Sequence, residues 1–151
     1  MAVKKSLNIS SPEFSQGGNI PVDYTCEGSG KNPPVNIKDI PKETKSLVLI
    51  VEDPDAPGKT FDHWVVWNIP PQETIKEDSI PGEVGKNSKG ENRYTGPCPP
   101  SGTHRYFFKV YALDTLLEIK NSAGKKIVEQ ALQNHILAYG ELVGNYKKQK
   151  N

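Results

Sequence analysis

The sequence predicts a mostly β domain, in which antiparallel strands pack as two sheets and a single helix comes late in the chain. Glycine and proline number 13 each among 151 residues, and this density divides the chain into short segments and argues against long helices. The segments between them are apolar runs rich in β-branched and aromatic side chains, which favour strands. Helical periodicity occurs only after Ser122. The length suits one domain, so we expect residues 1–151 to fold as a unit.

Three strands are expected, at residues 46–52, 63–69 and 105–113. Their sequences are SLVLIVE, HWVVWNI and RYFFKVYAL, and turn-forming Pro, Gly or Asp residues bound each of them. In a β domain of this kind the ligand site usually lies where loops from several strands meet.

One helix of about four turns is expected after Asn121 and Ser122, either of which would cap its start. Gly140 is expected to end it, and residues 142–146, LVGNY, to form a last short strand. The residues that recur at helical spacing are Ile127, Ala131, Leu132, Ile136 and Tyr139.

The charge and the N-terminus exclude several classes of partner. Nineteen basic residues against 18 acidic ones give a formal charge of +1, so no general attraction to nucleic acid is expected. No run approaches the roughly 18 apolar residues that would span a bilayer. The start, MAVKKSLNIS, has no apolar signal segment. We therefore expect a cytoplasmic protein without integral membrane contact.

The motifs of metal, nucleophilic and nucleotide chemistry are missing from the sequence. There is no H-E-x-x-H zinc motif, no G-x-S-x-G nucleophile elbow and no Walker loop. The two cysteines, Cys26 and Cys98, lack C-x-x-C spacing and are too few for a disulfide scaffold. Whether they form one bridge is left open by the sequence. We expect no metal, no cofactor and no catalysis.

Acids and histidines lie at the ends of the expected strands. Asp53 and Asp55 are two residues apart, and Pro54 favours extended backbone at Asp53, so the two carboxylates would share a face. An Asx-type turn at the strand end is the alternative. His63 and His104 begin the next two strands, and all these groups would converge if the three strands are neighbours.

The resulting set of hydrogen-bond donors suits a small anion such as phosphate. It comprises the imidazoles of His63 and His104, the phenol of Tyr106 and the backbone N–H groups of residues 101–103. A carboxylate such as Asp53 that bonds one ring nitrogen would fix the tautomer and leave the other N–H facing the pocket.

Three nearby side chains have structural interpretations. Tyr106 alternates with Phe108, so packing in the core is as well supported as ligand contact. Arg105 points away from Tyr106 in an extended strand, which favours a structural ion pair. His135 would lie late in the helix, where a cap or a packing role is expected.

Several of these segments together resemble the phosphatidylethanolamine-binding protein family, also called Raf kinase inhibitor proteins, in its shorter bacterial and archaeal branch. The most specific are DPDAP at 53–57, DHWVVWNIP at 62–70 and GPCPPSGTHRYFFKVYALD at 96–114. YTCEG at 24–28 and HILAYGELVGNY at 135–146 fit the same branch, so the resemblance covers nearly the whole chain.

The resemblance implies an antiparallel β-sandwich with a small pocket for phosphate or the phosphorylethanolamine head group. The prolines in this pocket would hold its rim rigid and supply apolar walls. The residues carried over by motif position are Asp53, Asp55, Pro57, His63, Pro99, Pro100, His104 and Tyr106.

The resemblance further implies a non-catalytic binding or regulatory protein, with a kinase or another phosphorylated protein among its partners. The alternative is a serine protease inhibitor acting through the rigid Pro-rich loops at 53–58 and 96–103. A hydrolase is disfavoured because no activated nucleophile is visible. Eukaryotic members continue into a C-terminal helix that closes the pocket, whereas this chain ends five residues after Tyr146. A more open pocket, or a homodimer that completes it, is therefore expected.

Overall fold

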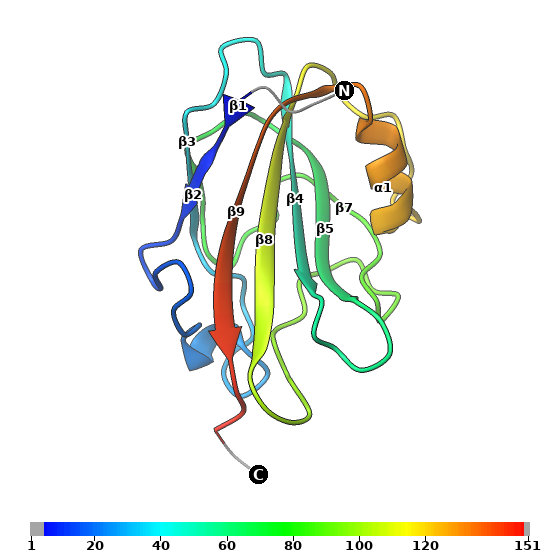
Figure 1. The fold of residues 1–151 in the computed structure, drawn as a ribbon. Helices are drawn as coiled ribbons and strands as arrows, with labels where there is room; N and C mark the ends of the chain where they lie inside the picture. Colours follow the sequence, from blue (N-terminus) through cyan, green and yellow to red (C-terminus); the bar gives the residue numbers. More distant parts are fainter. Residues whose placement is uncertain (1–4, 150–151) are drawn as a thin grey trace.

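The computed structural model describes residues 5–149, so the first four residues of the N-terminal segment considered above lie outside the described part. The described residues form nine strands, one α-helix and one short 3₁₀ helix, and Figure 1 shows how the elements are arranged. They are β1 (Lys5–Ser6), β2 (Asn8–Ser10), η1 (Val22–Tyr24), β3 (Val35–Lys38), β4 (Ser46–Asp53), β5 (Phe61–Ile69), β6 (Thr74–Ile75), β7 (Glu83–Val84), β8 (His104–Leu113), α1 (Lys125–Leu132) and β9 (Ile136–Tyr146).

The strands form two sheets, as the sequence predicts. The larger sheet has the order β1-β9-β8-β4-β5-β7 and the smaller has the order β2-β3-β6. Strand pairs are antiparallel except that of β1 with β9, which is parallel. The fold is a mostly antiparallel β-sandwich, and the expected strands at 46–52, 63–69 and 105–113 are β4, β5 and β8.

The large sheet is covered on both faces, which explains the composition of its central strands. Leu49 and Val51 of β4 belong to the core between the two sheets, whereas Val48 and Ile50 pack on the opposite side with Val128 of α1. Helix α1 lies over that outer face (Figure 1). A strand that is buried on both faces has no side toward solvent, so its sequence is a continuous apolar run rather than an alternation of apolar and polar residues.

The helix begins later than expected. Gly124 occupies the N-cap position with no side-chain hydrogen bond, so neither Asn121 nor Ser122 caps α1. Within residues 5–149, no helix combines the length and the apolar character needed to cross a membrane.

The helix also ends earlier than expected, and the segment assigned to its last turns is a strand. Asn134 has φ 69°, a left-handed conformation that Asn tolerates better than most residues and that reverses the chain after α1. His135 therefore lies beyond the helix, where its Nδ1 is 2.8 Å from an Asp114 carboxylate oxygen. From Ile136 onward the buried residues alternate, and they pair along the length of β8.

Gly140 lies inside strand β9 and does not end a helix. A methyl group at this position would come 2.2 Å from the carbonyl oxygen of Leu7 and 2.9 Å from the Ile9 side chain. Glycine therefore allows the β1–β2 segment to cross directly over β9.

Replacing Gly140 with Ala should lower the free energy of unfolding by about 2 kcal/mol or more, because the added methyl group collides with backbone that cannot move aside cheaply. Urea unfolding followed by circular dichroism measures the effect. Gly124→Ala is the matched control, since the nearest atom to its new methyl group is 3.5 Å away. Equal losses in the two variants would contradict this packing.

Candidate functional site

A cavity of about 390 Å³ opens at the end of the large sheet where β4 ends and where β5 and β8 begin. Because β8, β4 and β5 are neighbours, the chain segments around these strand ends meet there (Figure 1). Of the residues that the sequence predicts for the site, those that line the cavity are Asp53, Pro57, His63, Pro99, Pro100, His104 and Tyr106.

Asp53 and His104 form a buried hydrogen-bonded pair in this cavity. Their side chains are 4% and 9% exposed, and Nδ1 of His104 lies 2.7 Å from Oδ2 of Asp53. The other Asp53 oxygen accepts a hydrogen bond of 2.8 Å from the backbone N–H of Asp55. Asp53 thus makes the alternative Asx-type turn and also faces the cavity, whereas the expectation that the Asp55 carboxylate shares this face is wrong.

The Asp53 contact fixes which nitrogen of His104 can meet a ligand. A carboxylate only accepts, so Nδ1 of His104 carries the hydrogen and Nε2 is left for the cavity. The expectation that the second nitrogen presents an N–H holds only for the charged ring, because a neutral imidazole has one N–H. The pair therefore offers a lone pair at Nε2 when the ring is neutral, and a donor when it is protonated.

A β-bulge directs His63 into the cavity. Val51 pairs with Trp64 and Glu52 pairs with Asp62, so His63 is an extra residue on β5. Strict alternation after Trp64, which packs between the sheets, would put His63 on the outer face. The extra residue shifts the alternation by one, as bulges beside functional sites often do.

The surroundings of His63 keep its imidazole ring uncharged. Its Nδ1 donates to the carbonyl oxygen of Thr95 over 2.7 Å, which leaves its Nε2 for a ligand. Burial lowers the pKa of His63 below its ordinary value by more than the Thr95 hydrogen bond raises it. The ring is therefore neutral near pH 7, and its Nε2 is an acceptor.

Tyr106 belongs to both the core and the cavity. Its ring is fully buried in the core between the sheets and also lines the cavity. The ring centroid lies 5.3 Å from that of His63 and 6.5 Å from that of His104. Its hydroxyl is buried and makes no hydrogen bond of normal geometry among residues 5–149, although it lies near the Asp53 carboxylate. Burial, followed by the negative charge of Asp53, raises the pKa of Tyr106, so the phenol is neutral and can donate.

Asp55 is not among the residues that line the cavity. Arg105 engages its carboxylate through Nε and through a terminal nitrogen, each at 2.9 Å, and the backbone N–H of Arg105 adds a third hydrogen bond. This guanidinium contact lowers the pKa of Asp55 to about 2. The alternation of β8 places the Arg105 side chain on the opposite face from Tyr106, and Asp55 binds Arg105 there. This ion pair therefore stabilises the edge of the cavity from outside.

Lys89 lines the cavity, although its sequence context gave no signal beyond an ordinary Lys-Gly turn. The side chain of buried Asn87 organises this turn, accepting from the backbone N–H groups of Lys89 and Glu91 at 2.9 and 3.0 Å. By contrast, the backbone groups of residues 101–103 are not part of the lining. The cavity therefore gains a cationic side chain that was not expected, and it lacks the backbone N–H donors that were expected from residues 101–103.

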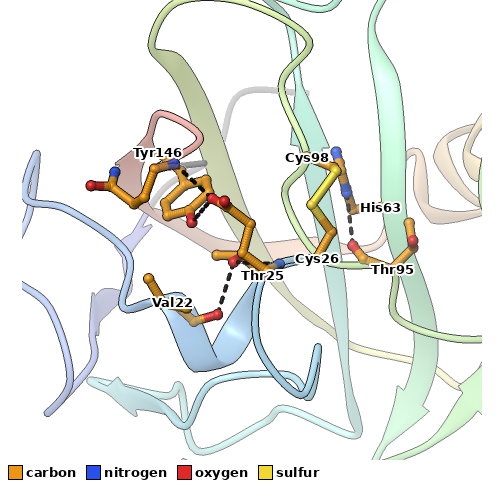
Figure 2. Close-up of a disulfide and its surroundings, with 9 residues drawn as sticks. Val22, Thr25, Cys26, His63, Thr95, Cys98 and Tyr146 are labelled. Carbon is orange, nitrogen blue, oxygen red and sulfur yellow. Dashed lines mark hydrogen bonds between the residues drawn. A yellow bond between two sulfur atoms is a disulfide. The ribbon is translucent and has the colours of Figure 1, made fainter. Parts of the chain in front are cut away.

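A disulfide between Cys26 and Cys98 forms part of the cavity wall and settles the pairing that the sequence leaves open. The two Cα atoms are 5.4 Å apart, although the residues are 72 positions apart in sequence. Figure 2 shows the bridge joining the segment after η1 to the loop that carries Thr95. The backbone N–H of Cys26 also donates to the carbonyl oxygen of Pro97 over 3.1 Å.

The cavity lining consists of hydrogen-bonding and apolar side chains. Within residues 5–149, no group of three or more His, Cys, Asp or Glu side chains is arranged to hold a metal ion. The cavity combines two oriented imidazoles, a phenol and a lysine with apolar proline and phenylalanine walls, so its polar groups are suited to hydrogen bonding.

Comparison with known sequences gives matches over nearly the whole chain. The sequence model of the phosphatidylethanolamine-binding protein family matches residues 10–147. The UPF0098 protein of Methanothermobacter thermautotrophicus is 45% identical over 150 residues, covering 94% of this chain and 99% of that protein. A UPF0098 protein of Pyrococcus horikoshii is 50% identical over 157 aligned positions, covering 96% of this chain and 78% of that protein.

Solved structures agree with the sequence matches. A homologue of phosphatidylethanolamine-binding proteins from Chlamydia trachomatis superposes with a TM-score of 0.92 at 40% identity, covering 97% of this chain and all of that one. E. coli YbcL, a member of the same family, superposes with a TM-score of 0.87 at 28% identity, covering 95% of this chain and 99% of that one. The chain therefore belongs to the phosphatidylethanolamine-binding protein family.

Proposed function

We propose that the cavity binds a small anion, a phosphate or the phosphate of a larger group, and that the protein acts by binding rather than by catalysis. One observation carries the proposal: both cavity histidines have Nδ1 engaged by a protein oxygen, at 2.7 Å in each case. Both rings are thereby fixed in orientation, and both Nε2 atoms are left to a ligand.

The two imidazoles favour a ligand that both accepts and donates hydrogen bonds. When an anion is bound, a protonated His104 ring beside Asp53 would donate from Nε2 to an anionic oxygen, and the phenol of Tyr106 would supply a second donor. Neutral His63 can only accept at Nε2. A phosphate group that retains one hydrogen satisfies all three, whereas sulfate has no hydrogen to offer His63.

The remaining lining supports a phosphate that belongs to a larger molecule. A volume of about 390 Å³ exceeds that of a bare phosphate, and Pro57, Phe61 and Pro99 add apolar wall. Both cavity cysteines are bridged, so neither is available as a thiolate nucleophile. A phosphorylated protein, a kinase among the candidates, or a phosphorylated head group would present suitable chemistry.

Serine protease inhibition through a rigid loop is the alternative function. Residues 100–103 are exposed between the Cys26–Cys98 bridge and the start of β8, so the loop is fixed at both ends. A loop held in this way loses little entropy when a protease binds it. Inhibition of this kind would persist in a His104→Ala variant, whereas anion binding would not.

We expect saturable binding of inorganic phosphate and O-phosphorylethanolamine in isothermal titration, and its loss in His104→Ala, because that variant removes the oriented donor. His135→Ala is the matched control, because this half-buried histidine pairs with Asp114 outside the cavity. This variant should bind phosphate as the wild type does. Unchanged affinity in His104→Ala would remove His104 from the site.

Phosphate should bind more tightly than sulfate near pH 7, by about tenfold, because the neutral His63 ring accepts a hydrogen that phosphate carries and sulfate does not. Since burial lowers the pKa of His63, its ring becomes protonated only below its ordinary pKa, so the preference for phosphate should be lost only at such acidic pH. Isothermal titration with both anions measures the preference. Equal affinity for the two anions near pH 7 would contradict this assignment of donors and acceptors.

Tyr106→Phe should separate binding from stability. The Tyr106 hydroxyl makes no hydrogen bond of normal geometry among the described residues, so its removal should leave the free energy of unfolding unchanged or raise it by up to about 1 kcal/mol. Phosphate affinity should fall by about tenfold, because the buried donor to the anion is lost. A destabilised variant with normal affinity would show that the hydroxyl serves the fold alone.

A further inference from the structure

The Cys26–Cys98 disulfide is exposed at the cavity, which is unusual for a purely structural bridge. Both cysteines are solvent-exposed, and both contribute to the cavity wall. A thiolate from solution can therefore approach the sulfur atoms without opening the core. Exposed disulfides are in general the labile ones, whereas those that only support a fold are usually resistant to reduction.

The two sides of the bridge are anchored very differently. On the Cys26 side, buried Thr25 donates from its hydroxyl to the Val22 carbonyl oxygen over 2.8 Å, and Tyr94 donates to the Tyr24 carbonyl oxygen over 2.7 Å (Figure 2 shows the Thr25 bond). Gly96 packs so closely on Thr25 that a methyl group would come within 2.9 Å of its backbone. These contacts do not need the disulfide.

On the Cys98 side, the bridge is the main restraint on the rim. None of the hydrogen bonds that the structure describes involves residues 99–102, and two of these residues are prolines without an N–H group. The next fixed point along the chain is His104, through Asp53. Pro99 and Pro100 line the cavity, and their position depends on the packing of buried Pro99 and on a covalent bond that a thiol can reach.

We propose that Cys26–Cys98 is a thiol-exchange site, at which a dithiol reductant opens the bridge and thereby loosens the rim of the cavity. One thiolate of the dithiol attacks one Sγ atom and forms a mixed disulfide, and the other cysteine leaves as a thiolate that takes a proton from water. The second thiolate of the dithiol then attacks the mixed disulfide. The products are two cysteine thiols and the cyclic disulfide of the reductant, so two electrons pass from the dithiol to the bridge.

The exchange is coupled to the anion site, and this coupling rests on the proposed function. With the bridge closed, the proline wall is already ordered before an anion arrives, whereas with the bridge open the wall must be ordered during binding. A cysteine thiolate at the wall would also repel an anion and compete for Lys89. The oxidised protein therefore binds phosphate more tightly, and bound phosphate in turn favours the closed bridge by the same factor.

The experiment begins with the native protein equilibrated in buffers with a series of ratios of reduced to oxidised dithiothreitol. Free thiols are trapped with a maleimide and counted by intact mass, and circular dichroism reports the fold. We expect two maleimides per chain at reducing ratios without denaturant, with an unchanged β spectrum. Labelling that requires denaturant would overturn the proposal.

The effect on the rim is read in two ways. Hydrogen exchange of the Cys26 amide, whose N–H donates to the Pro97 carbonyl oxygen on the other side of the bridge, should accelerate on reduction, while peptides from β4 should not change. Phosphate affinity should fall by about tenfold on reduction, and saturating phosphate should shift the dithiothreitol midpoint toward the disulfide by a matching factor. If reduction leaves both the exchange and the affinity unchanged, or unfolds the protein, the proposal is wrong.

The double variant Cys26→Ser with Cys98→Ser is the matched control, because serine has nearly the shape of cysteine and cannot form a bridge. It should resemble the reduced protein with and without dithiothreitol. If the oxidised protein fails to bind phosphate, the proposed function fails, and labelling together with hydrogen exchange still decides the thiol-exchange site. If phosphate binds and the bridge does not exchange, only the present inference fails.

Discussion

The hydrogen bond between Asp53 and His104 is the interaction on which the arrangement of the cavity depends. It joins the end of β4 to the start of β8, and it requires these strands to be neighbours in the large sheet. A buried carboxylate without this partner would carry the desolvation penalty of an isolated charge and would repel the anion that we propose for the cavity. With His104 protonated, the pair is neutral overall and presents a hydrogen-bond donor to the ligand.

Two further groups that face the cavity, His63 and Tyr106, also occur at features that do not stabilise the fold. The bulge at His63 interrupts the pairing of β4 with β5, and the fully buried Tyr106 leaves its hydroxyl without a hydrogen bond of normal geometry among the described residues. Neither feature strengthens the sheet. A bound group would complete the hydrogen bonding of both, and the Cys26–Cys98 bridge forms part of the wall of the same cavity.

The sequence predicts the parts of the structure that depend on local pattern, and it fails where distant contacts decide. Strands β4, β5 and β8 follow from their apolar runs, but the apolar spacing of residues 136–139 suggested a helix because pairing with β8 is not visible in one segment. Gly140 appeared to end that helix, whereas it makes room for Leu7, a contact between remote positions. At the site, the acids and histidines at the strand ends predicted the cluster. The sequence did not indicate Lys89, which lies in an ordinary turn, and it did not show that Asp55 pairs with Arg105 instead of lining the cavity.

The central claim is that Asp53 fixes a hydrogen on Nδ1 of His104 and that an anion brings a second one to Nε2. A long-range ¹H–¹⁵N correlation spectrum of the histidine rings, recorded near pH 7 with and without phosphate, measures this directly. The account predicts a hydrogen on Nδ1 of both His63 and His104 in the free protein, and a doubly protonated ring at His104 alone when phosphate saturates the protein. An Nδ1 without a hydrogen at free His104, or a neutral His104 ring in the complex, would contradict it.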